Sequence, residues 1–210
     1  MPVIAPSILS ADFANLERDI HDIERSGADW VHVDVMDGMF VPNIAIGIPV
    51  VKALRPVTSL PLDVHLMIDR PIRYAEEFIK AGADWLTIHL ESDQPQNTLA
   101  CLDKIRAMGC KAAISLKPKT PAEAAIPYLT ECDMVLVMTV EPGFGAQKFK
   151  VKKIRQMLDE VNPACIIEVD GGVDAVTYRT CRENGAEALV TGSAYFKAAD
   201  RAAFVKTLRA

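Results

Sequence analysis

Short apolar runs recur along the chain, and amphipathic stretches lie between them. The runs are rich in the β-branched and aromatic residues that suit strands. Most are almost continuously hydrophobic, which is typical of a parallel sheet covered by helices on one side and packed on the other. We predict eight strands, at Val3–Leu9, Trp30–Val35, Leu62–Met67, Trp85–Leu90, Lys111–Leu116, Met134–Val140, Ile166–Val169 and Ala188–Thr191.

The stretches between these runs have the pattern of amphipathic helices. In the first of them, Phe13, Leu16 and Ile20 recur at helical spacing. Several stretches begin with proline or with a residue that favours an N-cap. We predict helices at Asp12–Ser26, Pro49–Leu54, Pro71–Ala81, Pro95–Met108, Pro121–Thr130, Gln147–Glu160, Asp174–Asn184 and Asp200–Leu208.

A weak repeat marks the junctions between predicted helices and strands. The segments SGADW (26–30), AGADW (81–85) and NGAEAL (184–189) place a glycine after a helix, where it favours a left-handed C-cap. Eight strands that alternate with helices predict an α/β fold, a closed (β/α)8 TIM barrel. An open doubly wound sheet is the alternative, but no GxGxxG follows Val3–Leu9. We find no linker and expect one domain over residues 1–210.

Charge, apolar run length and cysteine spacing exclude several classes of partner and location. The net charge of −5 and the lack of a basic cluster argue against nucleic acid and against a membrane surface. No apolar run approaches the roughly 18 residues of a membrane span, and the N-terminus lacks the pattern of a signal peptide. The five scattered cysteines form no CxxC, which indicates free thiols in a reducing cytosol. We therefore expect a cytoplasmic protein.

Histidine and aspartate side chains fall at the ends of neighbouring predicted strands. His32 and Asp34 lie on one face of their strand, because side chains alternate along it. His65 follows on the next strand, and Asp170 ends the seventh. Each histidine taken singly could be a hydrogen-bonded core residue. Together these four residues predict a site for one divalent cation, Zn, Fe(II), Mn or Co, at the face where such barrels carry their active sites.

Other polar residues on the strands have less definite roles. Asp63 lies two residues before His65, and we expect it to be structural, with orientation of a neighbour as the alternative. We expect His89 and Glu91 to be satisfied polar residues rather than supporting groups of the cation site.

Glycines follow the last three predicted strands. Gly143-Phe144-Gly145 follows the sixth, Gly171-Gly172 the seventh and Gly192-Ser193 the eighth. Glycine lets backbone N–H groups approach an anion closely, and the loops after the last strands of such barrels commonly bind phosphate. The chain has no GxxxxGK[ST] segment, so a nucleoside triphosphate is not expected. We predict a phosphorylated small molecule as the ligand.

Four long motifs resemble those of the ribulose-phosphate 3-epimerase family: VHVDVMDGMFVPN (31–43), LDVHLM (62–67), MTVEPGFGAQKF (138–149) and EVDGGV (168–173). The similarity runs from APSILSADF to TGSAYF. It implies a barrel of the ribulose-phosphate-binding type that forms a homo-oligomer. It also implies a metal-dependent enzyme of the pentose phosphate pathway or Calvin cycle. Such an enzyme inverts C3 of D-ribulose 5-phosphate through an enediolate and gives D-xylulose 5-phosphate.

The resemblance also implies roles for individual residues. The cation would be held by His32, Asp34, His65 and Asp170, and the two aspartates would form the acid/base pair. Substrate contacts would come from Ser7, His65, Gly143, Phe144, Gly145, Ala146, Gly171, Gly172, Gly192 and Ser193. Three methionines would cap the reacting centre: Met36, Met67 and Met138. The chain departs from the family pattern at Met39, often His or Arg there, and at Ala146, where a second glycine is usual.

This chemistry accounts for the residue types. Inversion requires that a proton leave one face of C3 and arrive on the other, so two opposed acid/base groups suffice. A divalent cation stabilises the charge of the enediolate, and methionines cover it without supplying protons.

Three other functions compete with this one. The nearest is a 3-epimerase for a six-carbon ketose phosphate such as D-allulose 6-phosphate. A metal-dependent lyase or decarboxylase would typically place a lysine among the acidic residues, whereas Lys117 is isolated on the fifth strand. A catalytically silent phosphosugar-binding protein would not need two opposed carboxylates.

Overall fold

The computed structural model describes residues 1–139 and 144–210, with side chains at 1–139 and 149–210. Its strands are β1 (Val3–Pro6), β2 (Val31–Asp37), β3 (Ile44–Ala45), β4 (Leu62–Met67), β5 (Trp85–His89), β6 (Lys111–Leu116), β7 (Met134–Met138), β8 (Ile166–Asp170) and β9 (Ala188–Thr191). Its α-helices are α1 (Leu16–Arg25), α2 (Ile48–Leu54), α3 (Ala75–Ala81), α4 (Pro95–Ala107), α5 (Phe144–Val161), α6 (Tyr178–Glu183), α7 (Ser193–Phe196) and α8 (Arg201–Arg209). Short 3₁₀ helices cover Ile8–Ser10, Phe13–Asn15, Arg55–Val57, Pro71–Arg73, Leu90–Ser92 and Ala122–Tyr128.

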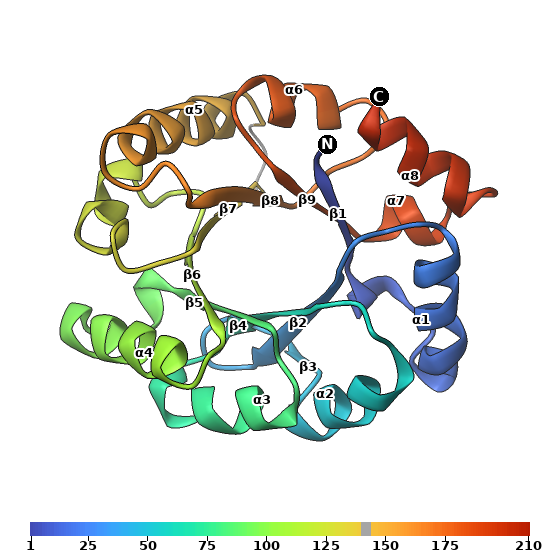
Figure 1. The fold of residues 1–210 in the computed structure, drawn as a ribbon, viewed down its shortest axis with the longest axis horizontal. Helices are drawn as coiled ribbons and strands as arrows, with labels where there is room; N and C mark the ends of the chain where they lie inside the picture. Colours follow the sequence, from blue (N-terminus) through green and yellow to red (C-terminus); the bar gives the residue numbers. More distant parts are fainter. Residues whose placement is uncertain (140–143) are drawn as a thin grey trace.

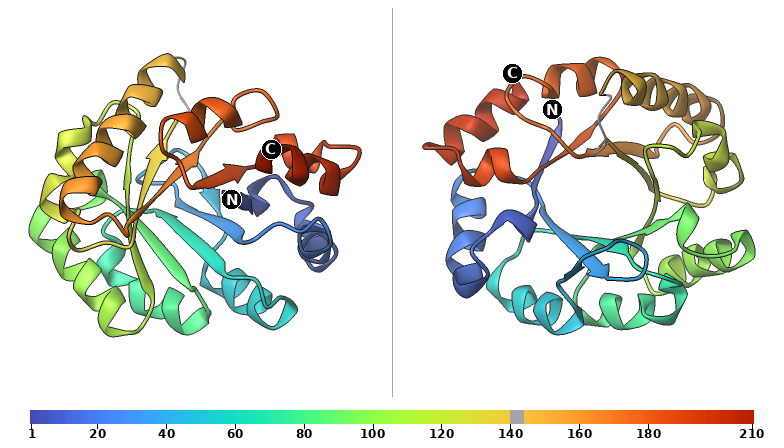
Figure 2. Two further views of the ribbon diagram at one scale, coloured as in Figure 1. Left: turned by 45° about the horizontal axis from the view of Figure 1, so that its top comes forward. Right: turned by 180° about the vertical axis from the view of Figure 1, so that it is seen from behind.

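The strands form one sheet that curls into a ring (Figure 1). Its order is β1-β9-β8-β7-β6-β5-β4-β2-β3, and neighbouring strands are parallel except β2 and β3. A parallel bridge between Ser7 and His32 joins the ends of β1 and β2 and closes the ring. Helices lie around the outside (Figures 1 and 2). The α/β class predicted from the sequence is confirmed, and the ring is consistent with a barrel rather than with an open sheet.

The predicted strands agree with the observed ones to within a few residues. Leu62–Met67 and Lys111–Leu116 have the predicted bounds, whereas the run predicted over 134–140 ends as a strand at Met138. Val140 lies outside the described residues. The two-residue strand β3 was not predicted, because Ile44 and Ala45 pair only with the end of β2 and are too short for a periodic pattern.

Several predicted helices are shorter or tighter than expected. Proline inside Ala122–Tyr128 is incompatible with regular α-helical hydrogen bonds, and this segment is a 3₁₀ helix. The stretch predicted over 174–184 is helical only at Tyr178–Glu183. The four-residue helix α7 was not predicted, since its single turn is too short to show periodicity. Among residues 1–139 and 144–210, no helix combines the length and apolarity needed to cross a membrane.

Alternation along the strands separates an apolar outer face from a partly polar interior. On β2, Val31, Val33 and Val35 belong to the hydrophobic core, whereas His32 and Asp34 between them are buried polar residues. The side chains of one face of a strand point the same way, so the polar residues of β2 point into the ring when its valines pack outward. The interior of the ring thus carries buried polar groups such as His32 and Asp34.

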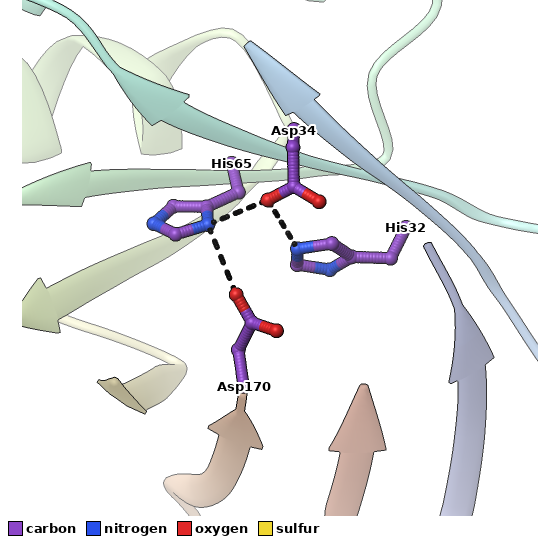
Figure 3. Close-up of side chains that lie close together, drawn as sticks. All are labelled: His32, Asp34, His65 and Asp170. Atoms are coloured by element: carbon purple, nitrogen blue, oxygen red, sulfur yellow. Dashed lines mark hydrogen bonds and ion pairs between the residues drawn. The ribbon is translucent and has the colours of Figure 1, made fainter. Parts of the chain in front are cut away.

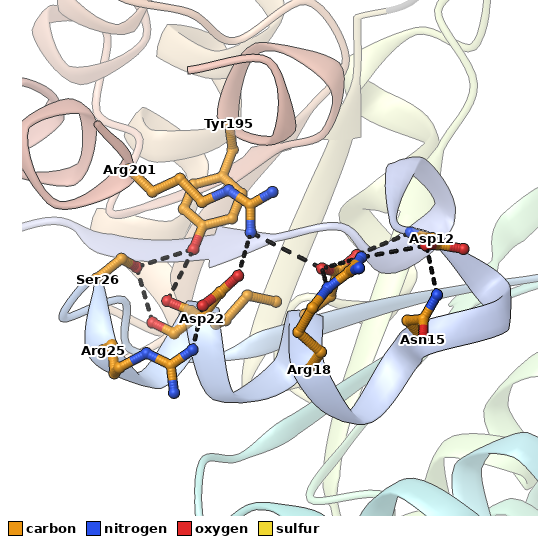
Figure 4. Close-up of polar contacts among 10 residues, drawn as sticks. Asp12, Asn15, Arg18, Asp22, Arg25, Ser26, Tyr195 and Arg201 are labelled. Carbon is orange, nitrogen blue, oxygen red and sulfur yellow. Dashed lines mark hydrogen bonds and ion pairs between the residues drawn. The ribbon is translucent and has the colours of Figure 1, made fainter. Parts of the chain in front are cut away.

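The two ends of the chain lie close together (Figures 1 and 2), and polar contacts link the first helix to the last two (Figure 4). The hydroxyl of Tyr195, at α7, donates to the Asp22 carbonyl at 3.2 Å and contacts Ser26 Oγ at 3.0 Å. Arg201 of α8 donates to the Asp22 carboxylate at 2.9 Å. These contacts complement the pairing of β1 with β9 and hold the closing segments of the ring together.

We expect Tyr195→Phe to lower the free energy of unfolding by about 1 kcal/mol. Tyr195 is fully buried, and phenylalanine keeps its ring while removing the hydrogen bonds of its hydroxyl. Urea unfolding of the variant and the wild type measures the difference. Equal stabilities would show that the hydroxyl contacts add nothing to the closure.

Candidate metal centre and active site

The four predicted cation ligands meet at one point inside the ring: His32, Asp34, His65 and Asp170 (Figure 3). One nitrogen or oxygen atom of each lies within 4.8 Å of the corresponding atoms of the others. Asp34 Oδ1 lies 3.3 Å from both His32 Nε2 and His65 Nδ1. His65 Nδ1 lies 3.9 Å from Asp170 Oδ2.

The sheet register explains this convergence. Asp34 on β2 and His65 on β4 are directly paired neighbours, so their side chains lie side by side on one face. Asp170 ends β8 and approaches from the other side of the cluster (Figure 3). Thr139 holds the end of β8, because its backbone N–H and its hydroxyl donate to the Asp170 carbonyl at 2.7 and 2.9 Å.

His32 is placed between two carboxylates. Its Nδ1 lies 2.5 Å from Asp63 Oδ2, and its Nε2 faces Asp34. Burial opposes a charge on the imidazole, but the negative charges of Asp34 and Asp63 raise the pKa of His32 well above its usual range. The surroundings of Nε2 therefore favour positive charge, which either a proton or a cation bound at that nitrogen would supply.

The two aspartates differ in their acidity. Burial tends to raise the pKa of Asp34, but the imidazoles of His32 and His65 lower that pKa far below its usual range. Burial and the nearby charge of Asp34 raise the pKa of Asp170 to about 6. Two imidazoles and two crowded carboxylates form a donor set that fits a divalent transition metal or zinc.

A cavity of about 660 Å³ opens above this cluster. Asp34 and Asp170 line it, whereas His32 and His65 lie beneath it and are fully buried. The three methionines predicted as an apolar cap also line the cavity: Met36, Met67 and Met138. The cavity thus joins a polar floor to an apolar, polarisable wall.

Five of the residues predicted to contact the substrate also line the cavity, Ser7, Gly171, Gly172, Gly192 and Ser193, whereas His65, predicted as a further contact, does not. Ser7 Oγ donates to Asp34 Oδ2 at 2.5 Å. Gly171 and Gly172 have φ of 110° and 64°, values that favour glycine. Gly143 lies outside the described residues, and so do the side chains of Phe144 and Ala146 in the first turn of α5, where Gly145 also lies.

The sequence did not predict the wall formed by Phe40 and Lys117. Lys117 Nζ lies 3.6 Å from the centre of the Phe40 ring and donates to the Phe40 carbonyl at 3.4 Å. Both residues line the cavity. The apolar segment MFVPN (39–43) after β2 could have indicated this wall. An apolar loop at the mouth of a barrel is expected to pack over the site instead of facing solvent.

His89 and Glu91 are hydrogen-bonded, as expected, but His89 also contacts the cluster through His65. His89 Nε2 lies 2.9 Å from His65 Nε2, and His89 Nδ1 lies 3.2 Å from Glu91 Oε2. Burial lowers the pKa of His89 to about 4 although Glu91 opposes the shift, so the imidazole is neutral at pH 7.

Comparison with known proteins identifies the family. Residues 3–196 match the sequence profile of the ribulose-phosphate 3 epimerase family. The chain is 48% identical over 213 residues to the ribulose-phosphate 3-epimerase of Bacillus subtilis, covering 98% of this chain and 97% of that protein. It is 48% identical over 216 residues to the chloroplastic ribulose-5-phosphate-3-epimerase of Arabidopsis thaliana, covering 99% of this chain and 76% of that protein.

A solved structure of 3-hexulose-6-phosphate synthase superposes with a TM-score of 0.74 at 21% identity, covering 100% of this chain and 98% of that one. This likeness concerns the fold alone. The sequence matches confirm the family predicted from the motifs. The chain belongs to the ribulose-phosphate 3-epimerase family.

Proposed function

We propose that the protein interconverts D-ribulose 5-phosphate and D-xylulose 5-phosphate by inverting C3. The observation that carries this proposal is a pair of carboxylates, Asp34 and Asp170, that line one cavity and approach the cation cluster from opposite sides (Figure 3). Carboxylates that reach one substrate from opposite sides suit paired roles as base and acid. The family membership supports the choice of a phosphorylated ketopentose.

In this mechanism the two aspartates act on opposite faces of C3. One carboxylate takes the proton from one face of C3, and the other delivers a proton to the opposite face. Their roles exchange when the reaction runs in the other direction. The methionine side chains exclude water from the enediolate and offer it no proton.

The cluster of His32, Asp34, His65 and Asp170 would hold one divalent cation. When bound, such a cation supplies positive charge that stabilises negative charge on the substrate oxygens. Ser7 donates to Asp34 and thereby fixes the direction of its carboxylate. The glycine-rich ends of β8 and β9 would receive the phosphate, because their backbones are open to close approach by an anion.

The position of Lys117 argues against a lyase or decarboxylase. Its ammonium contacts the ring and carbonyl of Phe40 rather than standing between the carboxylates of Asp34 and Asp170. The six-carbon ketose phosphates remain the nearest alternative substrates, because their C3 inversion would use the same groups.

Substrate comparison tests the assignment. We expect kcat/KM to be higher for D-ribulose 5-phosphate than for D-allulose 6-phosphate, measured with the same metal-loaded protein by NMR. The reason is the match, over nearly the whole chain, to proteins named for the five-carbon substrate. A higher kcat/KM for D-allulose 6-phosphate would show that the proposed substrate is wrong, whereas the proposed C3 inversion would still hold.

We also propose that residues 1–210 form one (β/α)8 barrel of the ribulose-phosphate-binding type. The closed ring of parallel strands and the likeness to 3-hexulose-6-phosphate synthase support this. The homo-oligomer and the cytoplasmic location stay predictions.

A further inference from the structure

The two histidines of the cluster present different ring nitrogens to it. His32 presents Nε2 to the cluster and places Nδ1 2.5 Å from Asp63. His65 presents Nδ1 to the cluster and places Nε2 2.9 Å from Nε2 of His89. His89 then reaches Glu91 through its Nδ1, at 3.2 Å. The second nitrogen of each histidine thus leads to a carboxylate, directly for His32 and through one imidazole for His65.

The position of each proton along the second path follows from the chemistry of imidazole. A neutral imidazole has one N–H and one lone pair. If His65 Nδ1 offers its lone pair to a cation, its proton lies on Nε2 and is donated to His89 Nε2. The proton of His89 must then lie on Nδ1, where Glu91 accepts it. The carboxylate of Glu91 at the end of this path sets the positions of both protons, because an ionised carboxylate only accepts hydrogen bonds.

Ring contacts and hydrogen bonds at the Glu91 end orient the groups of this path. The planes of the His65 and His89 rings are 25° apart and their centres 5.0 Å apart, as suits an N–H···N hydrogen bond between the ring edges, and the centre of the Phe40 ring lies 4.8 Å from that of His89. At the far end, Glu91 Oε1 accepts from the Lys117 backbone N–H at 2.8 Å and from the Thr120 hydroxyl. Glu91 is therefore fixed by the loop after β6 and keeps its other oxygen directed at His89.

We propose that His89 and Glu91 are positioning residues that hold His65 in the tautomer whose Nδ1 is free to bind a divalent cation. This inference rests on the proposed metal-dependent function and adds to it a chain of groups outside the cluster itself. Hydrogen-bond partners of metal-binding histidines fix the tautomer and orient the ring. The chain reaches from the floor of the cavity to the loop after β6.

Cobalt binding to the metal-free protein tests this role without substrate. We expect His89→Phe to weaken Co²⁺ binding about 10- to 100-fold, because phenylalanine fills the space but accepts no hydrogen bond from His65. His89→Gln should recover most of the affinity, since its amide accepts from His65 and donates to Glu91. The visible absorption of bound cobalt gives the dissociation constants.

Two further variants and one spectrum separate positioning from packing. Ser115→Ala is the matched control, because Ser115 is fully buried, is paired in register with His89, and its hydroxyl has no hydrogen-bond partner among the described residues. Glu91→Ala removes the end of the path at a partly exposed site and gives a test even if His89→Phe fails to fold. With four histidines in the chain, ¹⁵N NMR of labelled histidine reads which nitrogen of His65 carries the proton.

Weaker binding by His89→Phe and Glu91→Ala, recovery in His89→Gln and no change in Ser115→Ala would support the inference. Wild-type affinity in His89→Phe or Glu91→Ala would overturn it, as would equal losses in His89→Phe and His89→Gln. A wild-type protein that binds cobalt but does not epimerise would refute the proposed function and leave the positioning role standing. A wild-type protein that binds no cobalt would overturn both.

Discussion

Replacing Asp34 or Asp170 by asparagine is expected to lower kcat for C3 inversion by about 10³-fold or more. Asparagine keeps the shape and an oxygen near the cluster but neither accepts nor delivers a proton at neutral pH. Because each aspartate serves one face of C3, neither can replace the other. Steady-state rates in both directions, with the metal content of each variant measured in parallel, check this result.

Isotope exchange makes the test sharper. The carboxylate left in each variant should still remove the C3 proton from one of the two epimers, so that epimer takes up deuterium from D₂O without being inverted. The two variants should exchange opposite epimers. Asp103→Asn, an exposed position on α4, serves as the control and should behave as wild type. Exchange of the same epimer by both variants, or near wild-type inversion by either, would contradict the two-base assignment.

Removing the divalent cation is expected to lower turnover by at least about 10²-fold, since charge stabilisation by a metal amounts to several kcal/mol. Dialysis against a chelator followed by addition of Zn, Fe(II), Mn or Co should restore activity, and the metal that restores it best identifies the preferred ion. The assay is turnover at a fixed metal concentration.

Two histidine variants, one at a proposed ligand and one control, test whether the metal acts at this cluster. His32→Gln should stay inactive when metal is added back, because His32 contributes Nε2 to the cluster. His21→Gln, on helix α1, should recover as the wild type does. Full activity in protein in which elemental analysis finds no metal would contradict the ligand assignment.

The ring of strands could be predicted because buried parallel strands leave a strong signal. Segments such as Leu62–Met67 are buried at every position, and a short, mostly apolar run of this length is typical of a strand covered on both faces. The ends of helices were harder to predict. The proline within 122–128 and the single turn of α7 are governed by local hydrogen bonding, which periodicity does not detect.

The cation cluster could also be predicted, since alternation along β2 places His32 and Asp34 on one face and parallel pairing brings Asp34 beside His65. The contact between His65 and His89 could not be predicted, because it depends on the side-chain rotamers of both histidines. The wall of Phe40 and Lys117 likewise depends on the path of a loop. Pairing register sets which residues lie side by side on neighbouring strands, whereas side-chain rotamers set which atoms meet.

Proton exchange at C3 is the most direct test of the proposed function. The metal-loaded protein is incubated with D-ribulose 5-phosphate in D₂O, and the sugar is followed by NMR. We predict that deuterium enters C3 as D-xylulose 5-phosphate forms, that a chelator stops both changes, and that added metal restores them. Absence of exchange at C3 with metal bound would contradict the assignment of this substrate and of Asp34 and Asp170 as its acid and base.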